Sequence, residues 1–507
     1  MRTLAVYAGR TRGALALGRG SQSAFTPRLG VRRLQTAAPW LVLLAFCALT
    51  WWATPRRVGA AQFFDGRRDD GRPPGVLMVA MSAAVTWVFA KSIANASDLA
   101  YGYGLTGGLG YTVYYLSFVV AGSAIYLLRT RGGYRSLPHF LVSKYGVGAA
   151  KLFMLLVLFR LANEMWSNSK VMSLYFGPEG SSPYWLAVVL VTAFTVAYAW
   201  RGGMRASLTT DRIHIVLAFV LLALVLAVLF PGLEAKGLPV VSEATRDGGL
   251  TFCLLAFVQV FSYPFHDPVL TDRGFLNRPR QALQSFLLAS VLSGSFIFLF
   301  SLIGLYGLSF GLGKPTSVTV PASFGLAMLM AFNAIMLMTG GSTIDSTLTS
   351  VAKLSARDWR NNALDPTPRQ LATGRIAMVV VAVVGNLPLL SIYLGDRVGP
   401  AIIAATTISG TMVMGLAPIF LLSWVRSAGP ASFHMALWPG IIFGVIRAVE
   451  TFGHLHIVPT GLSLGSGPFA LDLGVNAWGL AVCTAGFAAG AVLAPRTGLS
   501  LAGLPQE

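Results

Sequence analysis

The chain has 507 residues, of which 55% are hydrophobic and only 11% are charged. This composition excludes an ordinary water-soluble globular protein and is typical of a polytopic membrane protein. The formal net charge of +19 does not indicate a nucleic-acid partner, because the basic residues fall in alternate loops between apolar segments.

The first 38 residues form a basic segment. They contain seven arginines and no acidic residue. Such a leader can be a transit peptide, a disordered tail or the product of a misassigned start codon. We interpret residues 1–38 as a basic N-terminal extension, disordered or misassigned, and infer no function from it.

Thirteen apolar runs of spanning or near-spanning length follow this extension. The loops between them are short and rich in Gly and Pro, which leaves no room for a soluble domain. The runs predict about thirteen transmembrane helices, at residues 39–54, 75–103, 108–128, 148–176, 183–200, 212–231, 249–265, 283–311, 320–352, 373–394, 399–425, 434–452 and 472–493.

Basic residues predict how these helices are oriented. One set of alternate loops is rich in Arg and Lys, whereas the other set contains only Lys236, Arg246, Lys314 and Arg397. By the positive-inside rule the basic loops are cytoplasmic. The start of the first helix is then outside, the C-terminus is inside, and the basicity of the chain records its topology.

Residues 339–358, TGGSTIDSTLTSVAKLSARD, carry hydroxyls and a carboxylate within an otherwise apolar run. Ser342, Thr343, Asp345 and Ser346 fall at helical spacings that put most of the polar groups on one face. Oxygen ligands inside a bilayer indicate an ion path. The alternative is that the hydroxyls bond back to their own helix or join it to a neighbour.

Four ordered segments, within residues 40–425, resemble the sodium:solute symporter family. Residues 98–146 contain DLAYGYGLTGG and RSLPHFLVSKYG, similar to the family's A-Y-x-x-G and L-P-E-F-L-x-x-R-Y-G segments. Residues 199–214, AWRGGMRASLTTDRIH, resemble its GG-x-x-A-x-x-x-TD-x-x-Q element, with His214 in place of Gln. Residues 263–275, YPFHDPVLTDRGF, resemble the element with a Tyr, an Asp and an Arg that follows its sixth core helix. The fourth segment has a hydroxyl pair followed sixteen positions later by an Asp, matched here by Ser342, Thr343 and Asp358.

This resemblance implies two inverted five-helix repeats in which the first helix of each is broken near mid-membrane. Pro264 and Pro268 predict the break in the sixth core helix, whereas the first core helix has no Gly or Pro at the expected place. We therefore expect an all-α polytopic membrane protein. Its parts are a leading helix and cytoplasmic loop in 39–74, a first repeat in 75–231, a second repeat in 249–425, and two C-terminal helices with a short tail in 426–507.

The resemblance also implies a sodium ion as cofactor. In the family, one sodium is held by backbone carbonyls of the broken first helix and the eighth helix, and by two hydroxyls of the latter. Carried over residue by residue, the ligands are Val85, Val88, Thr339, Ser342 and Thr343.

Two carboxylates are expected on the cytoplasmic side of that ion. Asp211 and Asp345 could form a second cation site or exit path, or could share a proton. The alternative is structural: Asp211 caps the helix that follows the Gly202-Gly203 turn, and Asp345 pairs with a basic residue such as Lys353.

Lys91 lies one turn beyond Val88, where the resemblance places polar groups that face the solute, with Ser92 beside it. It could hold a solute carboxylate, or it could neutralise an internal acid such as Asp98 or Glu164. In the second case neutral solutes such as urea remain possible substrates.

Aromatic residues complete the predicted solute site. Tyr263 matches the family's aromatic gate, and Tyr111 and Tyr114 are cavity candidates, although a buried Tyr also serves as packing. Two pairs at helical spacing, Arg160 with Glu164 and Arg447 with Glu450, are expected to be intrahelical ion pairs.

Together these features predict sodium-coupled secondary active uptake of a small polar organic solute, with a carboxylate or an amino acid favoured, by alternating access. The alternatives are a proton-coupled transporter or exchanger of the same fold, or a membrane-embedded solute sensor. An enzyme is not expected, because no metal cluster, nucleophile elbow or cofactor motif occurs. The expected setting is the bacterial inner membrane, as a multi-pass monomer or weak homo-oligomer whose partners are the solute and the lipid bilayer.

Overall fold

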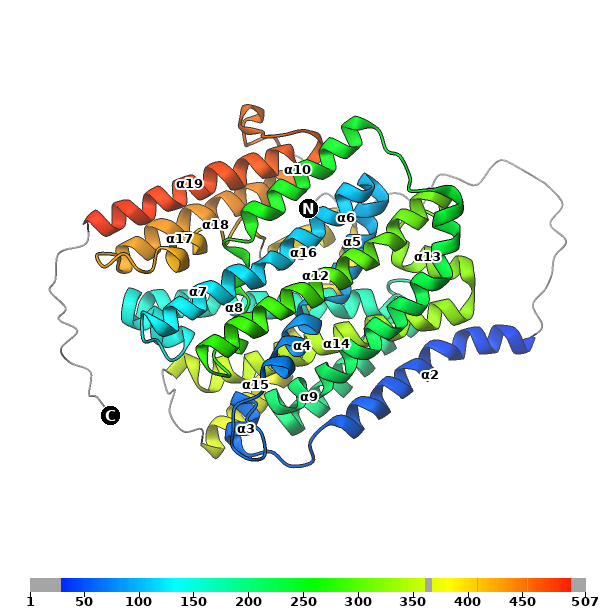
Figure 1. The fold of residues 1–507 in the computed structure, drawn as a ribbon, viewed down its shortest axis with the longest axis horizontal. Helices are drawn as coiled ribbons and strands as arrows, with labels where there is room; N and C mark the ends of the chain where they lie inside the picture. The colour runs from blue at the N-terminus through cyan, green and yellow to red at the C-terminus, as the bar shows by residue number, and fades with distance from the viewer. Residues whose placement is uncertain (1–28, 361–366, 408, 454, 494–507) are drawn as a thin grey trace.

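The computed structural model describes residues 29–360, 367–407, 409–453 and 455–493, and in these ranges the chain is helical and contains no β-strand. Nine of the described helices are long and apolar enough to cross a membrane, and a bent pair raises the number to ten. The helices lie side by side as a bundle, with α2 at one edge and the α18–α19 pair at the opposite edge (Figure 1). The protein is therefore an all-α, polytopic membrane protein, as its composition predicts.

Each apolar run predicted from the sequence contains helix. The principal helices are α2 Leu29–Ala53, α4 Val76–Trp87, α5 Ala90–Tyr103, α6 Leu105–Val113, α7 Ser117–Thr130, α8 Leu137–Ser173, α9 Ser182–Lys236, α10 Glu243–Gln259, α12 Pro279–Phe310, α13 Thr316–Phe324, α14 Leu326–Ala356, α15 Pro368–Val384, α16 Gly395–Ala405, α18 Pro430–Gly453 and α19 Ala470–Leu493. Short helices join them: α3 Ala60–Asp65, η2 Tyr114–Leu116, η3 Tyr263–His266, α11 Pro268–Arg273, η4 Asp358–Arg360, η5 Leu387–Leu394 and α17 Leu416–Leu421.

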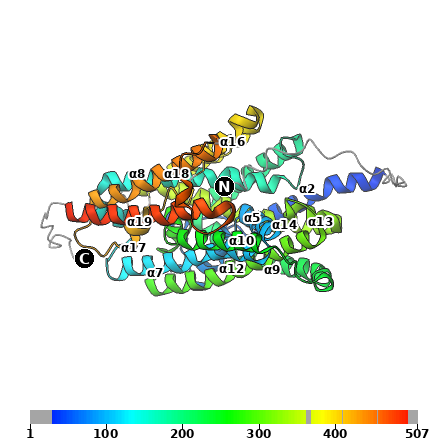
Figure 2. The same cartoon turned by 90° about the horizontal axis from the view of Figure 1, so that it is seen from above.

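The predicted N-terminal extension lies partly outside the described residues, since residues 1–28 are not described. The remainder of it is helical: α2 begins at Leu29 rather than near residue 39. This helix contacts α9 and α14, so its apolar half packs on the helices that carry the candidate ion ligands. Seen from above, α2 extends beyond the rest of the bundle (Figure 2).

Both breaks implied by the family resemblance are present. The α4–α5 pair bends by 61° between Trp87 and Ala90, although no Gly or Pro marks the place. The other break follows α10: Pro264 lies in η3 and Pro268 begins α11, and a proline ring cannot donate the N–H that would continue the α10 helix.

A third break was not predicted. The run at 399–425 divides into α16, which ends at Ala405, and α17, which begins at Leu416. The described residues between them include Thr406, Thr407 and Thr411, whose side-chain hydroxyls compete for backbone hydrogen bonds. The consequence is a polar, non-helical segment inside the bundle.

The Gly202-Gly203 turn lies inside α9, where Gly203 has φ 51 and ψ −143. Only glycine adopts that conformation readily, and a Cβ there would lie 2.5 Å from the ring and the carbonyl oxygen of Phe63 in α3. The helix resumes directly after the turn, so Asp211 lies about two turns inside it. The prediction that Asp211 caps this helix is therefore wrong.

Candidate ion and solute sites

The α4–α5 break supplies backbone carbonyls. Among the described residues, neither the carbonyl of Val85 nor that of Val88 accepts a backbone hydrogen bond. The neighbouring carbonyl of Thr86 accepts a bond of 3.0 Å from Thr343 Oγ1. Carbonyl dipoles released from a helix are the groups that coordinate dehydrated alkali cations in broken-helix transporters.

On α14 the predicted ligands divide into two groups. Thr343 Oγ1 lies 3.0 Å from the carbonyl oxygen of Thr339 as well as from that of Thr86, so these residues meet at the break. Ser342 Oγ instead lies 2.8 Å from Nδ1 of His214. His214 Nε2 in turn lies 2.9 Å from Thr50 Oγ1 of α2. The histidine therefore holds the Ser342 hydroxyl and connects it to the leading helix.

Asp345 is fully buried and is surrounded by hydroxyls. It accepts hydrogen bonds from Tyr198 (2.9 Å), Ser207 (2.8 Å) and Ser346 (3.0 Å). The predicted pair with Lys353 is wrong, because Lys353 Nζ lies 2.6 Å from Asp272 Oδ1. A packed helix face directs Asp345 inward, whereas Lys353, two turns later, reaches α11.

Arg273, the last residue of α11, enters the same cluster. Its guanidinium lies 3.4 Å from Asp211 Oδ2 and 2.7 Å from Ser346 Oγ, and both charged side chains are fully buried. Nε donates to Ser82 Oγ at 3.0 Å, and Nη2 donates to Thr86 Oγ1 at 3.2 Å. We call this group the ion cluster: Asp211, Asp345, Arg273, and the hydroxyls of Ser82, Thr86, Tyr198, Ser207 and Ser346.

The ion cluster has an unbalanced charge. With both carboxylates ionised, Arg273 leaves one negative charge uncompensated, and Oδ1 of Asp211 is buried without a hydrogen bond of good geometry from any described residue. Removing an unbalanced charge from water costs several kcal/mol. A proton or a bound cation would remove that cost.

A second charged group lies at the α5 end of the same break. Lys91 Nζ is 2.7 Å from Glu164 Oε1, and the Lys91 side chain is 20% exposed whereas that of Glu164 is 1% exposed. Arg160 pairs with Glu164 within α8, as predicted. Its Nη2 also lies 3.3 Å from Asp267 Oδ2. These four residues, which we call the charge quartet, carry two positive and two negative charges.

The predicted aromatic residues lie next to the charge quartet. Arg160 lies over the ring of Tyr263 at 5.5 Å from its centroid. The rings of Tyr263 and Tyr114 are 5.8 Å apart, and those of Tyr114 and Tyr111 are 5.5 Å apart. Tyr111 donates to Ser92 Oγ at 3.0 Å. All five predicted solute residues, Lys91, Ser92, Tyr111, Tyr114 and Tyr263, are thus connected through side-chain contacts.

Several site residues were not singled out from the sequence. Arg273 and Asp267 were noted only as family matches, and Ser82, Thr86 and Ser207 were not considered. A signal existed for the hydroxyls: Ser82 with Thr86, and Ser207 with Asp211, are spaced i,i+4, which places each pair on one helix face.

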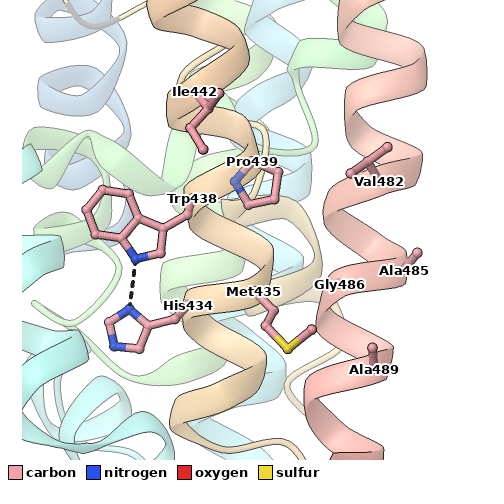
Figure 3. Close-up of a pocket in the computed structure, with 9 residues that line it drawn as sticks. All are labelled: His434, Met435, Trp438, Pro439, Ile442, Val482, Ala485, Gly486 and Ala489. Carbon is pink, nitrogen blue, oxygen red and sulfur yellow. Dashed lines mark hydrogen bonds between the residues drawn. The ribbon is translucent and has the colours of Figure 1, made fainter.

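Other parts of the molecule do not match these chemistries. No group of three or more His, Cys, Asp or Glu within the described ranges could hold a metal ion. A surface groove of about 700 Å³ lies between α18 and α19 and is lined mainly by apolar side chains such as Trp438, Val482 and Ala489. Its one imidazole, His434, accepts a hydrogen bond from Trp438 Nε1 (Figure 3). An apolar groove on the outside of a membrane bundle faces lipid, so we do not assign it to the solute.

Two ion pairs lie at the C-terminal end of α14. Lys353 pairs with Asp272, and Arg357 Nη1 lies 2.7 Å from Asp65 Oδ1 of α3. Asp358 follows in η4, and burial raises its pKa to about 6 against the pull of the Lys353 charge. Asp358, the residue that matched the family spacing, therefore belongs to this group and not to the ion cluster.

Comparison with known proteins supports the fold. No family model matches the chain. A Na⁺-coupled sialic acid symporter, solved in a substrate-bound outward-open state, is 14% identical, with a TM-score of 0.64 over 91% of this chain and 97% of that one. A mutant of the manganese transporter from Eremococcus coleocola is 11% identical, with a TM-score of 0.51 over 82% of this chain and 94% of that one. At these identities the likeness shows a shared fold and nothing finer.

Proposed function

We propose that this protein is a secondary active transporter that uses the inward movement of sodium to take up a small polar organic solute by alternating access. The observation that carries the proposal is the α4–α5 break. There, the carbonyl of Thr86 accepts a hydrogen bond from Thr343, the carbonyls of Val85 and Val88 accept no backbone hydrogen bond from a described residue, and the unbalanced ion cluster lies one turn away. The fold shared with a Na⁺-coupled symporter supports the same function.

The test is a double substitution, Ser342→Ala with Thr343→Ala, in purified protein reconstituted in proteoliposomes. We expect uptake to lose its sodium stimulation, because two oxygen ligands are removed while the apolar packing of α14 is kept. The matched control is Thr349→Ala with Ser350→Ala, which removes a hydroxyl pair two turns further along the same helix. Unchanged sodium stimulation in the first variant would refute the sodium-site assignment.

A second candidate, proton coupling, is favoured by one specific observation. Asp345 forms no ion pair with a described basic residue and accepts hydrogen bonds only from neutral hydroxyls. A carboxylate in that setting can carry the coupling proton as readily as it can face a second cation. An exchanger with this fold would use the same residue.

The remaining parts of the proposal follow from the sequence. We retain the division into repeats at 75–231 and 249–425, and the positive-inside orientation. The protein would act in the bacterial inner membrane as a monomer or weak homo-oligomer. A solute-sensing role would require solute binding without flux, which the same proteoliposomes would reveal.

A further inference from the structure

The third break, between α16 and α17, is held by side-chain amides. Asn163 of α8 donates to Thr407 Oγ1 at 3.2 Å, and Asn476 of α19 donates to Thr411 Oγ1 at 3.0 Å. Both amides also contact residues that lie next to the predicted solute residues. Asn163 accepts from Arg160 at 3.3 Å, and Asn476 accepts from Gln259 at 3.1 Å.

The aromatic residues join the same network. Tyr114 donates to Gln259 Oε1 at 2.6 Å, and Tyr114 also packs on Tyr263. Tyr114, Tyr263 and Thr407 are all partly exposed. Neutral donors and acceptors from η2, α8, α10, α19 and the third break therefore form one network that reaches the charge quartet at Arg160.

The charges of this region are already satisfied. Lys91 is bonded to Glu164, and Arg160 is bonded to Glu164 and Asp267, so no described cation of the quartet awaits an anion. A solute carboxylate would have to separate Lys91 from Glu164 and would leave that buried acid with Arg160 alone. Removing one partner of a buried pair costs far more than the pair itself contributes.

We propose that the transported solute carries no net charge and is held mainly by hydrogen bonds to the amides and hydroxyls that meet at the third break. This proposal rests on the transport function proposed above and names its substrate class. The charge quartet then serves to keep the site electrically neutral, and Thr407 and Gln259 determine specificity. The sequence had favoured a carboxylate or an amino acid as solute and had left two roles for Lys91 open; its contact with Glu164, 73 residues away, corresponds to the second of them, in which Lys91 neutralises an internal acid.

The test uses proteoliposomes and four radiolabelled probes: urea and glucose, which are uncharged, proline, which is zwitterionic, and acetate, which is anionic. We expect the wild type to accumulate at least one of the first three and not acetate. Glu164→Gln leaves one positive charge unbalanced, so it should reduce uptake of the neutral probe by roughly tenfold and should admit acetate. Lys91→Met with Glu164→Gln restores neutrality and should restore the wild-type preference.

A second pair of variants tests the hydrogen bonds. Thr407→Val removes the hydroxyl that Asn163 contacts and should raise the KM of the accepted probe while leaving kcat unchanged. Thr406→Val is the control, because within the described part of the chain its hydroxyl donates to carbonyls of its own helix alone. Comparing urea and glucose with proline identifies whether the neutral solute is uncharged or zwitterionic.

The proposal is overturned if the wild type accumulates acetate, if it accumulates none of the neutral probes, or if Lys91→Met abolishes uptake of an anion. Each probe is measured with and without a sodium gradient. If a neutral probe is taken up equally well without a sodium gradient, the proposed coupling is contradicted but the proposed solute class is not. The two failures are therefore distinguishable.

Discussion

The ion cluster and the charge quartet lie on opposite sides of the α4–α5 break, and they differ in charge balance. The ion cluster has two carboxylates for one guanidinium, whereas the quartet has two of each sign in direct contact. A buried site with an unmatched negative charge favours the binding of a cation, because the cation compensates that charge. A site whose charges are matched gains nothing from binding an ion of either sign. Charge balance thus separates the place where a coupling ion would bind from the place where a solute would bind.

One short helix connects the two groups. Asp267 caps α11 by accepting from the Val269 N–H at 3.0 Å and belongs to the quartet, whereas Arg273 ends the same helix and belongs to the ion cluster. A shift of α11 would therefore change both sites together. This arrangement gives a physical route by which occupation of one site could bias the other.

The largest effect is expected from removing the cation of the ion cluster. Arg273→Met leaves two buried carboxylates without a counter-charge, which should lower the free energy of unfolding by about 3–5 kcal/mol. Adding Asp211→Asn should recover much of that loss. Thermal melting of the purified variants measures both effects. Lys91→Met is the comparison from the quartet and should cost less, because it leaves one negative charge unbalanced whereas Arg273→Met leaves two; equal losses in the two single variants would contradict the difference in charge balance.

Asp345→Asn tests which ion balances the cluster. If Asp345 faces a second cation, the wild type should move more than one sodium per solute, and the variant should move one fewer. The ratio is read from reversal potentials in proteoliposomes. A wild-type ratio of one, with steeply pH-dependent uptake that the variant loses, would select the proton instead.

A smaller effect is expected at His214, which orients a candidate sodium ligand without joining either charged group. His214→Leu removes its hydrogen bond to Ser342, a contribution of about 1 kcal/mol, and should raise the sodium concentration for half-maximal uptake about fivefold. The control is Thr50→Val, which removes the hydrogen bond between Thr50 and His214 but keeps the one between His214 and Ser342. A sodium response that is unaltered in His214→Leu would show that Ser342 needs no such support.

Asp358 provides the control for any pH measurement, because it lies outside both charged groups. Its pKa is raised from 3.8 to about 6, so the folded state binds this proton more tightly than the unfolded chain does. The free energy of unfolding should therefore fall as pH rises from about 4 to about 6, and this part of the slope should vanish in Asp358→Asn. If uptake still depends on pH in Asp358→Asn, that dependence comes from another group. If the free energy of unfolding still falls with the same slope between about pH 4 and about pH 6 in this variant, the raised pKa of Asp358 is contradicted.

The sequence predicted the all-α membrane fold, the break at Pro264 and Pro268, and the burial of polar groups on α14, whereas its count of about thirteen transmembrane helices exceeds the nine or ten long enough to span among the described residues. These features are local: apolar runs of spanning length, missing backbone donors, and hydroxyls where Leu and Val are expected. The break at Trp87 to Ala90 had no local signal and was reached only through the family resemblance.

The partners of the site residues could not be predicted. Ser342 meets His214 and Asp345 meets Ser207, across 128 and 138 residues respectively, and for Lys91 the sequence left Asp98 and Glu164 both open. Each pairing depends on how whole helices are rotated against one another, which the periodicity of a single helix does not determine. The third break was missed because Thr and Ser are also ordinary residues of membrane helices.

The central claim, that the unbalanced side binds the coupling cation and the balanced side does not, is tested most directly by titrating sodium into purified protein and following the heat of binding. The account predicts saturable sodium binding in the wild type, no detectable binding in Ser342→Ala with Thr343→Ala, and an unchanged affinity in Lys91→Met with Glu164→Gln. Sodium binding that survives the first double substitution and disappears in the second would contradict it.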